Sequence, residues 1–273
     1  MIPQLAWHLR RWVRPLWASF RIGARGVFAY RAEALVTLFS ASLMASLNGL
    51  LWSAATKDRP GIAGVPSDEL LSYVVMAWVA VSFFASKVNE DIGRRFKEGQ
   101  ITADLLRPMS LQLQCYARDV GRASATLILQ TFPMFVMGFF AFGVKLPSHP
   151  QTWVYWGISL LLSHMINFGL SFLVGLAAFP LQNISGLTHV KGTLVSIFSG
   201  ALIPLDLYSG VLRTVVFALP FHSMAHTPTC IFLERDMPLA GLLGEQAAWA
   251  ALLWMAGMLA WRSAQRVLTV QGG

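Results

Sequence analysis

The chain has 273 residues, of which 55% are hydrophobic and only 12% are charged, and its mean hydropathy is +0.56. A soluble domain of ordinary composition carries about 25% Asp, Glu, Lys and Arg, so this chain has too little polar surface for a water-soluble fold of its size. The composition indicates an integral membrane protein and excludes a soluble enzyme, a nucleic-acid-binding module and a disordered tail. The net charge of +8 fits cationic residues held on the cytoplasmic side, beside anionic membrane lipids.

The first segment of the chain, residues 1–33, is predicted to form an amphipathic helix rather than a membrane span. At 100° per residue four of its arginines fall within about 60° of one another, and a set of apolar side chains falls on a separate arc, roughly opposite. The apolar set is Leu9, Trp12, Val13, Leu16, Phe20 and Val27. The arginines of the basic face are Arg10, Arg14, Arg21 and Arg25. A helix of this kind lies in the membrane interface, so we expect that location for it. The alternative is that it packs on the protein's own cytosolic surface.

The remaining residues, 34–273, are predicted to form an all-helical transmembrane domain with six spans. A helical span needs about 20 predominantly apolar residues, and six segments are long and apolar enough. The fifth is the weakest, because His189 and Lys191 lie near its start. The predicted spans are 34–55, 69–86, 123–143, 153–179, 187–204 and 243–261.

The distribution of Lys and Arg predicts the orientation of the chain. Sixteen of these residues fall on the side that holds both termini, and five fall on the other side. Because Lys and Arg are enriched in cytoplasmic loops, both termini are predicted to be cytoplasmic, in a multi-pass protein of the inner (cell) membrane.

The region between the fifth and sixth predicted spans, residues 204–238, contains two short apolar pieces separated by prolines and a glycine. They run from about 205 to 219 and from about 227 to 233. Each is too short to cross a bilayer, so we expect short re-entrant or interfacial helices that enter the outer leaflet.

Nucleotide-binding and common metal-binding motifs are missing from the chain. It has no G-x-x-x-x-G-K-[ST] loop and no H-E-x-x-H, G-x-S-x-G or C-x-x-C pattern. Two cysteines, Cys115 and Cys230, form neither a disulfide framework nor a metal site. We therefore expect no cofactor in this chain, and any uphill transport must take its energy from another chain.

The connection between the second and third predicted spans, residues 87–122, is rich in charge. Glu90 precedes Arg94 by four positions and Asp91 precedes Arg95 by four, which is the favourable order for ion pairs along a helix. Apolar side chains recur between these charges at near-helical spacing, which a fully solvated loop would not need. We interpret the connection as short cytosolic helices that dock a partner protein.

The order of these features resembles the permeases of type-two ABC exporters. The closest resemblance is to the bacterial branch in which Gly-x-Ile/Leu-x-x-x-Leu-Leu-Arg-Pro follows the second span. The residues that match this pattern are Gly99, Ile101, Leu105, Leu106, Arg107 and Pro108. Residues 200–205 and 219–221, with Pro228 before the last span, add to the resemblance. The sequence departs from the family at 207–209, where a Pro/Trp-containing turn is often found.

The resemblance implies a dimer, of identical or paralogous permeases, bound to two copies of a separate ATPase that holds ATP and Mg²⁺. The element between spans two and three would be the coupling helix that the ATPase grips, and the short outer helices would close an extracellular gate. Carried onto this chain, the coupling residues are Glu90, Asp91, Arg94, Arg95, Glu98, Leu105 and Arg107. The gate residues are Pro204, Asp206 and Pro220.

Polar residues inside the predicted spans are candidates for a substrate path, because such residues are costly in a membrane. Asn48 lies in the first span, and His164 and Asn167 share one face of the fourth. The alternative role is hydrogen bonding between helices. No acidic residue within a span is expected to face His164, so a proton relay there is not predicted.

Two other function classes stay open beside the ABC exporter permease. An integral-membrane enzyme of lipid metabolism would need acidic clusters or a His/Asp set at the membrane face, and a secondary transporter or channel would need paired intramembrane charges or broken-helix symmetry. Neither pattern is evident in the sequence. The substrate is not specified by any motif.

Overall fold

The computed structural model describes residues 2–57, 61–62, 65–101, 109–181 and 183–271. Its architecture is almost entirely helical. The helices and helical turns are α1 (Ile2–Ala29), α2 (Arg31–Thr56), α3 (Ser67–Phe84), α4 (Val88–Lys97), α6 (Leu111–Thr126), η1 (Leu127–Thr131), α7 (Phe132–Phe142), α8 (Pro150–Leu176), α9 (Ala178–Leu181), α10 (Ser185–Phe198), η2 (Leu205–Leu207), α11 (Gly210–Phe217), α12 (His222–Phe232) and α13 (Leu239–Gln271). Two short antiparallel strands, β1 (Gly61–Ile62) and β2 (Val65–Pro66), connect α2 to α3.

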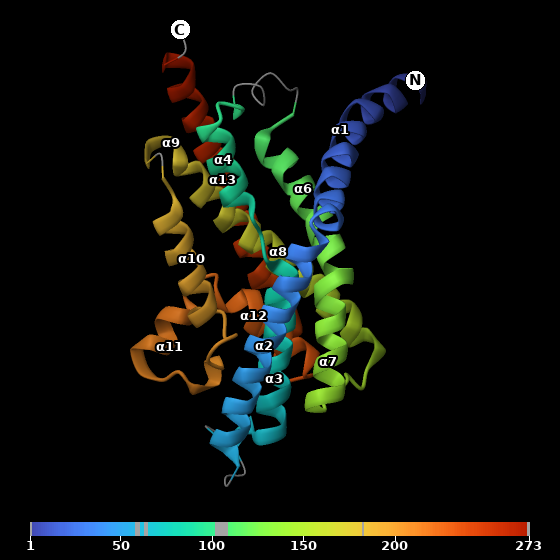
Figure 1. Ribbon diagram of the computed structural model, residues 1–273, viewed down its shortest axis with the longest axis vertical. Coiled ribbons are helices and arrows are strands. Elements are labelled where there is room, and N and C mark those ends of the chain that lie inside the picture. The colour runs from blue at the N-terminus through green and yellow to red at the C-terminus, as the bar shows by residue number, and fades with distance from the viewer. Residues whose placement is uncertain (1, 58–60, 63–64, 102–108, 182, 272–273) are drawn as a thin grey trace.

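The two ends of the helical bundle differ in what they carry. Both chain termini and α4 lie at one end, and the β1–β2 hairpin lies at the other (Figure 1). We call these the α4 end and the hairpin end. Helices α11 and α12 occupy the half of the bundle toward the hairpin end, with α12 inside it (Figure 1).

Five stretches of the described chain are long and apolar enough to cross a membrane. They are Arg31–Thr56, Ser67–Lys97, Leu111–Phe142, Pro150–Leu181 and Leu239–Gln265. Five of the six predicted spans therefore correspond to candidate spans, and the third candidate includes the π-helical turn η1 between α6 and α7.

The six-span count is not confirmed, because the predicted span 187–204 does not form one long helix. Helix α10 has only 14 residues, which makes it about 21 Å long against a hydrocarbon core of about 30 Å. The helix ends where Gly200 takes a φ of +89°, and a Cβ at that position would lie 2.3 Å from the Tyr73 hydroxyl. Only glycine allows this backbone to turn so close to α3.

Helices α3 and α8 form the centre of the bundle. In the most apolar 18-residue stretch of each candidate span, 67% of the residues are buried for the span of α3 and 61% for that of α8. The share is 22% for the spans of α2, α6–α7 and α13. Every one of the 11 residues of α12 is also buried. Short helices thus exist where 205–219 and 227–233 predicted them, while their depth in a membrane stays a prediction.

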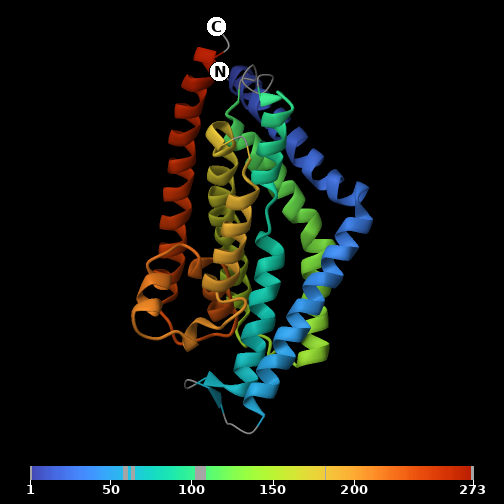
Figure 2. The same ribbon diagram turned by 60° about the vertical axis from the view of Figure 1, so that its left-hand side comes forward.

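The N-terminal segment is helical as predicted, and α1 packs against α6 of its own chain. A Cβ on Gly23 would lie 1.9 Å from the carbonyl oxygen of Arg118, and one on Gly121 would lie 2.0 Å from that of Phe20. The two backbones are therefore in direct contact. Figure 2 shows α1 and α2, both blue, meeting at an angle. An interfacial position of α1 in a membrane remains a prediction.

Candidate coupling element and charge ladder

Helix α4 is favoured by its own sequence. Glu90 and Asp91 lie in its first turn, and Arg94, Arg95 and Lys97 lie in its last turn, an order that complements the helix dipole. It ends where Gly99 has a φ of +70° and donates its N–H to the Phe96 carbonyl. Glycine is the usual residue for this left-handed helix end.

The inner face of α4 is anchored to the bundle by apolar and polar contacts. The Ile92 side chain is fully buried, and a Cβ on Gly175 of α8 would lie 3.0 Å from its Cδ1. The ring of Phe96 lies 4.8 Å from that of Phe179, and Asn89 donates a 2.8 Å hydrogen bond to Thr188 at the start of α10. Any movement of α4 therefore has to move or break contacts with α8, α9 and α10.

The predicted coupling residues divide between the outer and inner faces of α4. Glu90, Arg94 and Glu98 are exposed, and Asp91 and Arg95 are half-buried. Leu105 and Arg107, also predicted to contact the ATPase, lie outside the described residues.

The ion pairing on α4 differs from the predicted i,i+4 pattern. Arg94 Nη2 lies 3.1 Å from Asp91 Oδ1, three residues earlier, and Asp91 Oδ2 lies 3.1 Å from Nη2 of Arg122 on α6. Asp91 thus links α4 to another helix, a contact that spacing along one helix could not predict.

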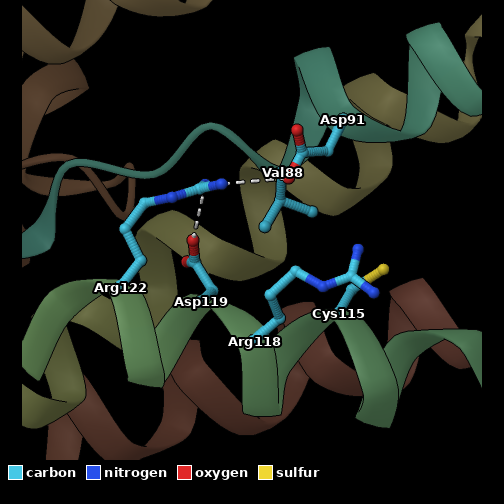
Figure 3. Close-up of a pocket in the computed structure, with 6 residues that line it drawn as sticks. All are labelled: Val88, Asp91, Cys115, Arg118, Asp119 and Arg122. Carbon is cyan, nitrogen blue, oxygen red and sulfur yellow. Dashed lines mark hydrogen bonds and ion pairs between the residues drawn. The ribbon is translucent and has the colours of Figure 1, made fainter. Parts of the chain in front are cut away.

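Behind Asp91 the alternation of charge continues into the bundle. Arg122 Nη1 lies 3.6 Å from Asp119 Oδ1, and Asp119 Oδ2 lies 3.5 Å from Nε2 of His164 on α8. Figure 3 shows Arg122 extended between Asp91 and Asp119. We call the series Arg94, Asp91, Arg122, Asp119 and His164 the charge ladder.

The charge ladder leads from solvent to the protein interior. The exposed fractions of its side chains, from Arg94 inward to His164, are 66%, 18%, 22%, 0% and 2%. It joins three helices, α4, α6 and α8. A small hollow lies beside it, lined by Val88, Asp91, Cys115, Arg118, Asp119 and Arg122 (Figure 3).

The prediction that no acidic residue of a span faces His164 is wrong for the candidate span Leu111–Phe142, because its Asp119 lies 3.5 Å from His164. Asp119 was assigned to the 87–122 connection, but α6 begins at Leu111 and continues without a break into the third span. A signal was available: Leu111, Cys115 and Asp119 follow at intervals of four residues, and all three are buried.

The two asparagines predicted to line a substrate path bond to backbone groups of other elements. Asn48 donates to the carbonyls of Ala201 and Leu202, at 3.2 and 3.1 Å, and Asn167 donates to that of Phe84 at 2.6 Å. Both side chains are buried in this chain. These contacts are hydrogen bonds between elements, and a role in a substrate path stays a prediction.

The predicted gate residues lie at the hairpin end. Pro204 precedes η2, Pro220 lies between α11 and α12, and Asp206 accepts two hydrogen bonds from Arg235 Nη1, at 3.1 and 2.9 Å. Arg235 Nε also donates to Glu69 at the start of α3, at 2.8 Å. Arg235 was not predicted from the sequence to be a functional residue, although its hydrogen bonds link η2 to α3. A role of these residues in gating stays a prediction.

Glu234, next to Arg235, caps the first turn of α8. Its carboxylate accepts hydrogen bonds from the Ser148 and His149 N–H groups, at 3.0 and 2.9 Å, and from the Thr152 hydroxyl at 2.7 Å. The bonds from Thr152 and from the His149 N–H lower the pKa of Glu234 to about 2.

No group of three or more His, Cys, Asp and Glu side chains that could hold a metal ion occurs in the described part of the chain.

Comparison with known proteins adds one finding. A family model described as ABC-2 family transporter protein matches residues 42–272, which include all of the chain from the middle of α2 to α13. No curated protein matches the chain.

Proposed function

We propose that this chain, which belongs to the ABC-2 transporter family, is an exporter subunit that forms a substrate path as a dimer and is driven by a separate ATPase. Membership in the family makes it a multi-pass membrane permease of an ABC transporter rather than an enzyme. The exporter direction, the dimer and the coupling to two ATPase copies holding ATP and Mg²⁺ are the proposed part. A secondary transporter, a channel and a lipid-modifying enzyme are the alternatives that it replaces.

The observation that supports the proposal best is helix α4. Its inner face is fixed to the bundle through Ile92 and Phe96, while Glu90, Arg94 and Glu98 are exposed at the end of the molecule that carries both termini. A short charged helix with one anchored face and one free face can accept a rigid push from a docked protein. The Lys/Arg bias supports placing this end, and the ATPase, in the cytoplasm.

The proposal is tested by purifying the chain, tagged, from its native membrane in detergent and assaying ATP hydrolysis. The wild-type chain is expected to co-purify with an ATPase. The double variant Glu90→Lys/Glu98→Lys reverses two exposed charges of α4, and we expect it to retain at most about a tenth of the bound ATPase, since mismatched interface charges cost more than about 1.4 kcal/mol.

Arg213→Glu is the matched control, because it reverses an exposed charge on α11, away from α4. It should leave the bound ATPase unchanged. If the wild-type chain purifies without any ATPase, the exporter loses its energy source, and the channel and secondary-transporter alternatives return.

A further inference from the structure

We propose that Arg122 and Asp119 are positioning residues that transmit a movement of α4 to α8, which makes the charge ladder the mechanical route from the ATPase to the membrane domain. The proposal rests on the proposed function, because the ATPase supplies the movement of α4. Beyond the proposed function, it names the residues that would transmit this movement within the chain.

Arg122 is a cation shared by two carboxylates. It makes a 3.1 Å hydrogen bond to Asp91 on α4, but its nearest nitrogen lies 3.6 Å from Asp119 on its own helix. The guanidinium has five N–H donors in a rigid fork, so it can serve both carboxylates or turn fully to one. In this structure it is bonded outward, to the coupling element.

The inner end of the ladder lacks hydrogen bonds. No hydrogen bond of standard geometry reaches the carboxylate oxygens of Asp119 or the ring nitrogens of His164 within the described part of the chain, although the Ser86 side chain lies near enough to interact with Asp119. The side chains are nevertheless 0% and 2% exposed. A carboxylate buried without hydrogen bonds is costly, so a direct hydrogen bond from the Arg122 guanidinium would stabilise Asp119.

A second arrangement follows from these two observations. If α4 moves and withdraws Asp91, Arg122 loses its outer partner and can rotate inward to bond Asp119 directly. That gain is large because the site excludes water. The position of α4 therefore decides between two discrete pairings of one arginine, and a two-state element of this kind can convert a small displacement into a defined change.

The change in Arg122 pairing affects helix α8 through His164. Its imidazole lies 3.5 Å from Asp119, and the rings of Phe83 and Tyr116 lie 6.0 and 6.1 Å from its ring. When Arg122 turns to bond Asp119, the carboxylate moves toward Arg122, and its 3.5 Å contact with His164 changes.

The neighbouring residue on α8 extends the route to α12. The Ser163 hydroxyl lies 3.3 Å from the carbonyl oxygen of Ser223 on α12 and accepts a 3.1 Å hydrogen bond from Gln246 on α13. A shift of α8 at His164 thus reaches the buried helix α12 within one residue.

The test places spin labels on both helices in the complete complex with its ATPase, in lipid nanodiscs. Lys97→Cys reports on α4, and Leu161→Cys, at a position that is 58% exposed, reports on α8. The native Cys115 and Cys230 are buried and stay in place. The measured quantity is the change in label mobility between the nucleotide-free and the ATP-bound complex.

The ladder is then altered in the labelled proteins. Asp119→Asn keeps the side-chain size and removes the charge, and Arg122→Gln leaves a shorter polar side chain without the charge. Either one should reduce the α8 response by about fivefold or more while the α4 response persists. Arg122→Lys, which keeps the cation, should retain part of the α8 response. Arg262→Gln, an exposed arginine on α13, is the matched control and should change neither response.

Two results would overturn the proposal, and they differ in meaning. An α8 response of wild-type size in both Asp119→Asn and Arg122→Gln would show that the movement takes another route, while the ATPase coupling stands. Absence of any ATP response at the α4 label of the wild-type complex would overturn the proposed function and this inference together. If Asp119→Asn fails to fold, Arg122→Gln decides alone.

Discussion

At the scale of single residues, Glu234 shows how one side chain fixes two elements. It has a φ of +52°, in the left-handed region that side chains other than glycine rarely adopt, and its carboxylate caps the first turn of α8. The backbone strain is therefore compensated by charge-assisted hydrogen bonds to Ser148, His149 and Thr152. The chain between α12 and α13 is held to α8 at this point.

The first prediction concerns the pH dependence of this cap. Because hydrogen bonds from Thr152 and His149 lower the pKa of Glu234 to about 2, from an ordinary 4.5, ionised Glu234 stabilises the fold above pH 4.5 and loses that effect as the pH falls toward 2. Glu234→Gln should lower the melting temperature at pH 7, and the difference from wild type should shrink between pH 5 and the acid limit.

Thermal unfolding in detergent, followed across this pH range, checks the prediction. Asp236→Asn is the control, because Asp236 is exposed in the same connection. A Glu234→Gln variant as stable as wild type at pH 7 would show that the carboxylate charge adds nothing to the cap.

At the scale of elements, the sequence predicts best what depends on local composition. Uniformly apolar runs of about 20 residues predicted α2, α3, α7, α8 and α13, and the charge order around Glu90 and Arg94 predicted α4. Helix α10 was predicted too long because residues 199–204 are as apolar as a span, while Gly200 and Pro204 turn the backbone there. A hydropathy average cannot predict a backbone turn within an apolar stretch.

The start of α6 and the pairing of Arg122, Asp119 and His164 were not predicted, because charged residues here belong to a helix rather than to a loop. Asp119 and Arg122 make the residues of α6 look like a polar loop, and their partners Asp91 and His164 are distant in sequence. Pairing across helices depends on how the helices pack, and a single sequence does not specify that. The presence of α4 could thus be predicted, but its link to α8 could not.

The second prediction tests the packing of α1 on α6. Gly23→Ala would place a Cβ 1.9 Å from the Arg118 carbonyl oxygen, and backbone atoms cannot move aside as a flexible side chain can. We expect a loss of stability of about 1–3 kcal/mol, typical of overpacking, measured as a lower melting temperature in detergent.

The same helix provides the matched control for that experiment. A Cβ on Gly26, three residues later, meets nothing within 4 Å, so Gly26→Ala should be neutral or slightly stabilising. If Gly23→Ala is as stable as Gly26→Ala, α1 does not pack on α6 in the membrane, and the interfacial position predicted from its two faces would gain support.

At the scale of the whole molecule, the positions of the termini constrain the path of the chain. Both termini lie at the α4 end, so the chain must traverse the bundle an even number of times (Figure 1). Only five described stretches are long and apolar enough to do so as single helices. We therefore expect one traverse to be made jointly, by α10 with the segment that includes α11 and α12.

The third prediction is that the chain changes sides of the membrane between α9 and α13 although no long helix lies there. Asn183, before α10, and Asp236, after α12, are both exposed, and cysteines at these positions should react from opposite sides with a maleimide that does not cross membranes. Asn183→Cys should behave like Lys97→Cys on α4 and react only in inside-out vesicles, as the Lys/Arg bias requires. Asp236→Cys should react in intact cells.

If Asn183→Cys and Asp236→Cys react from the same side, α10 to α12 form a re-entrant excursion rather than a crossing. The two termini would then lie on opposite sides of the membrane, contrary to their shared end in the bundle.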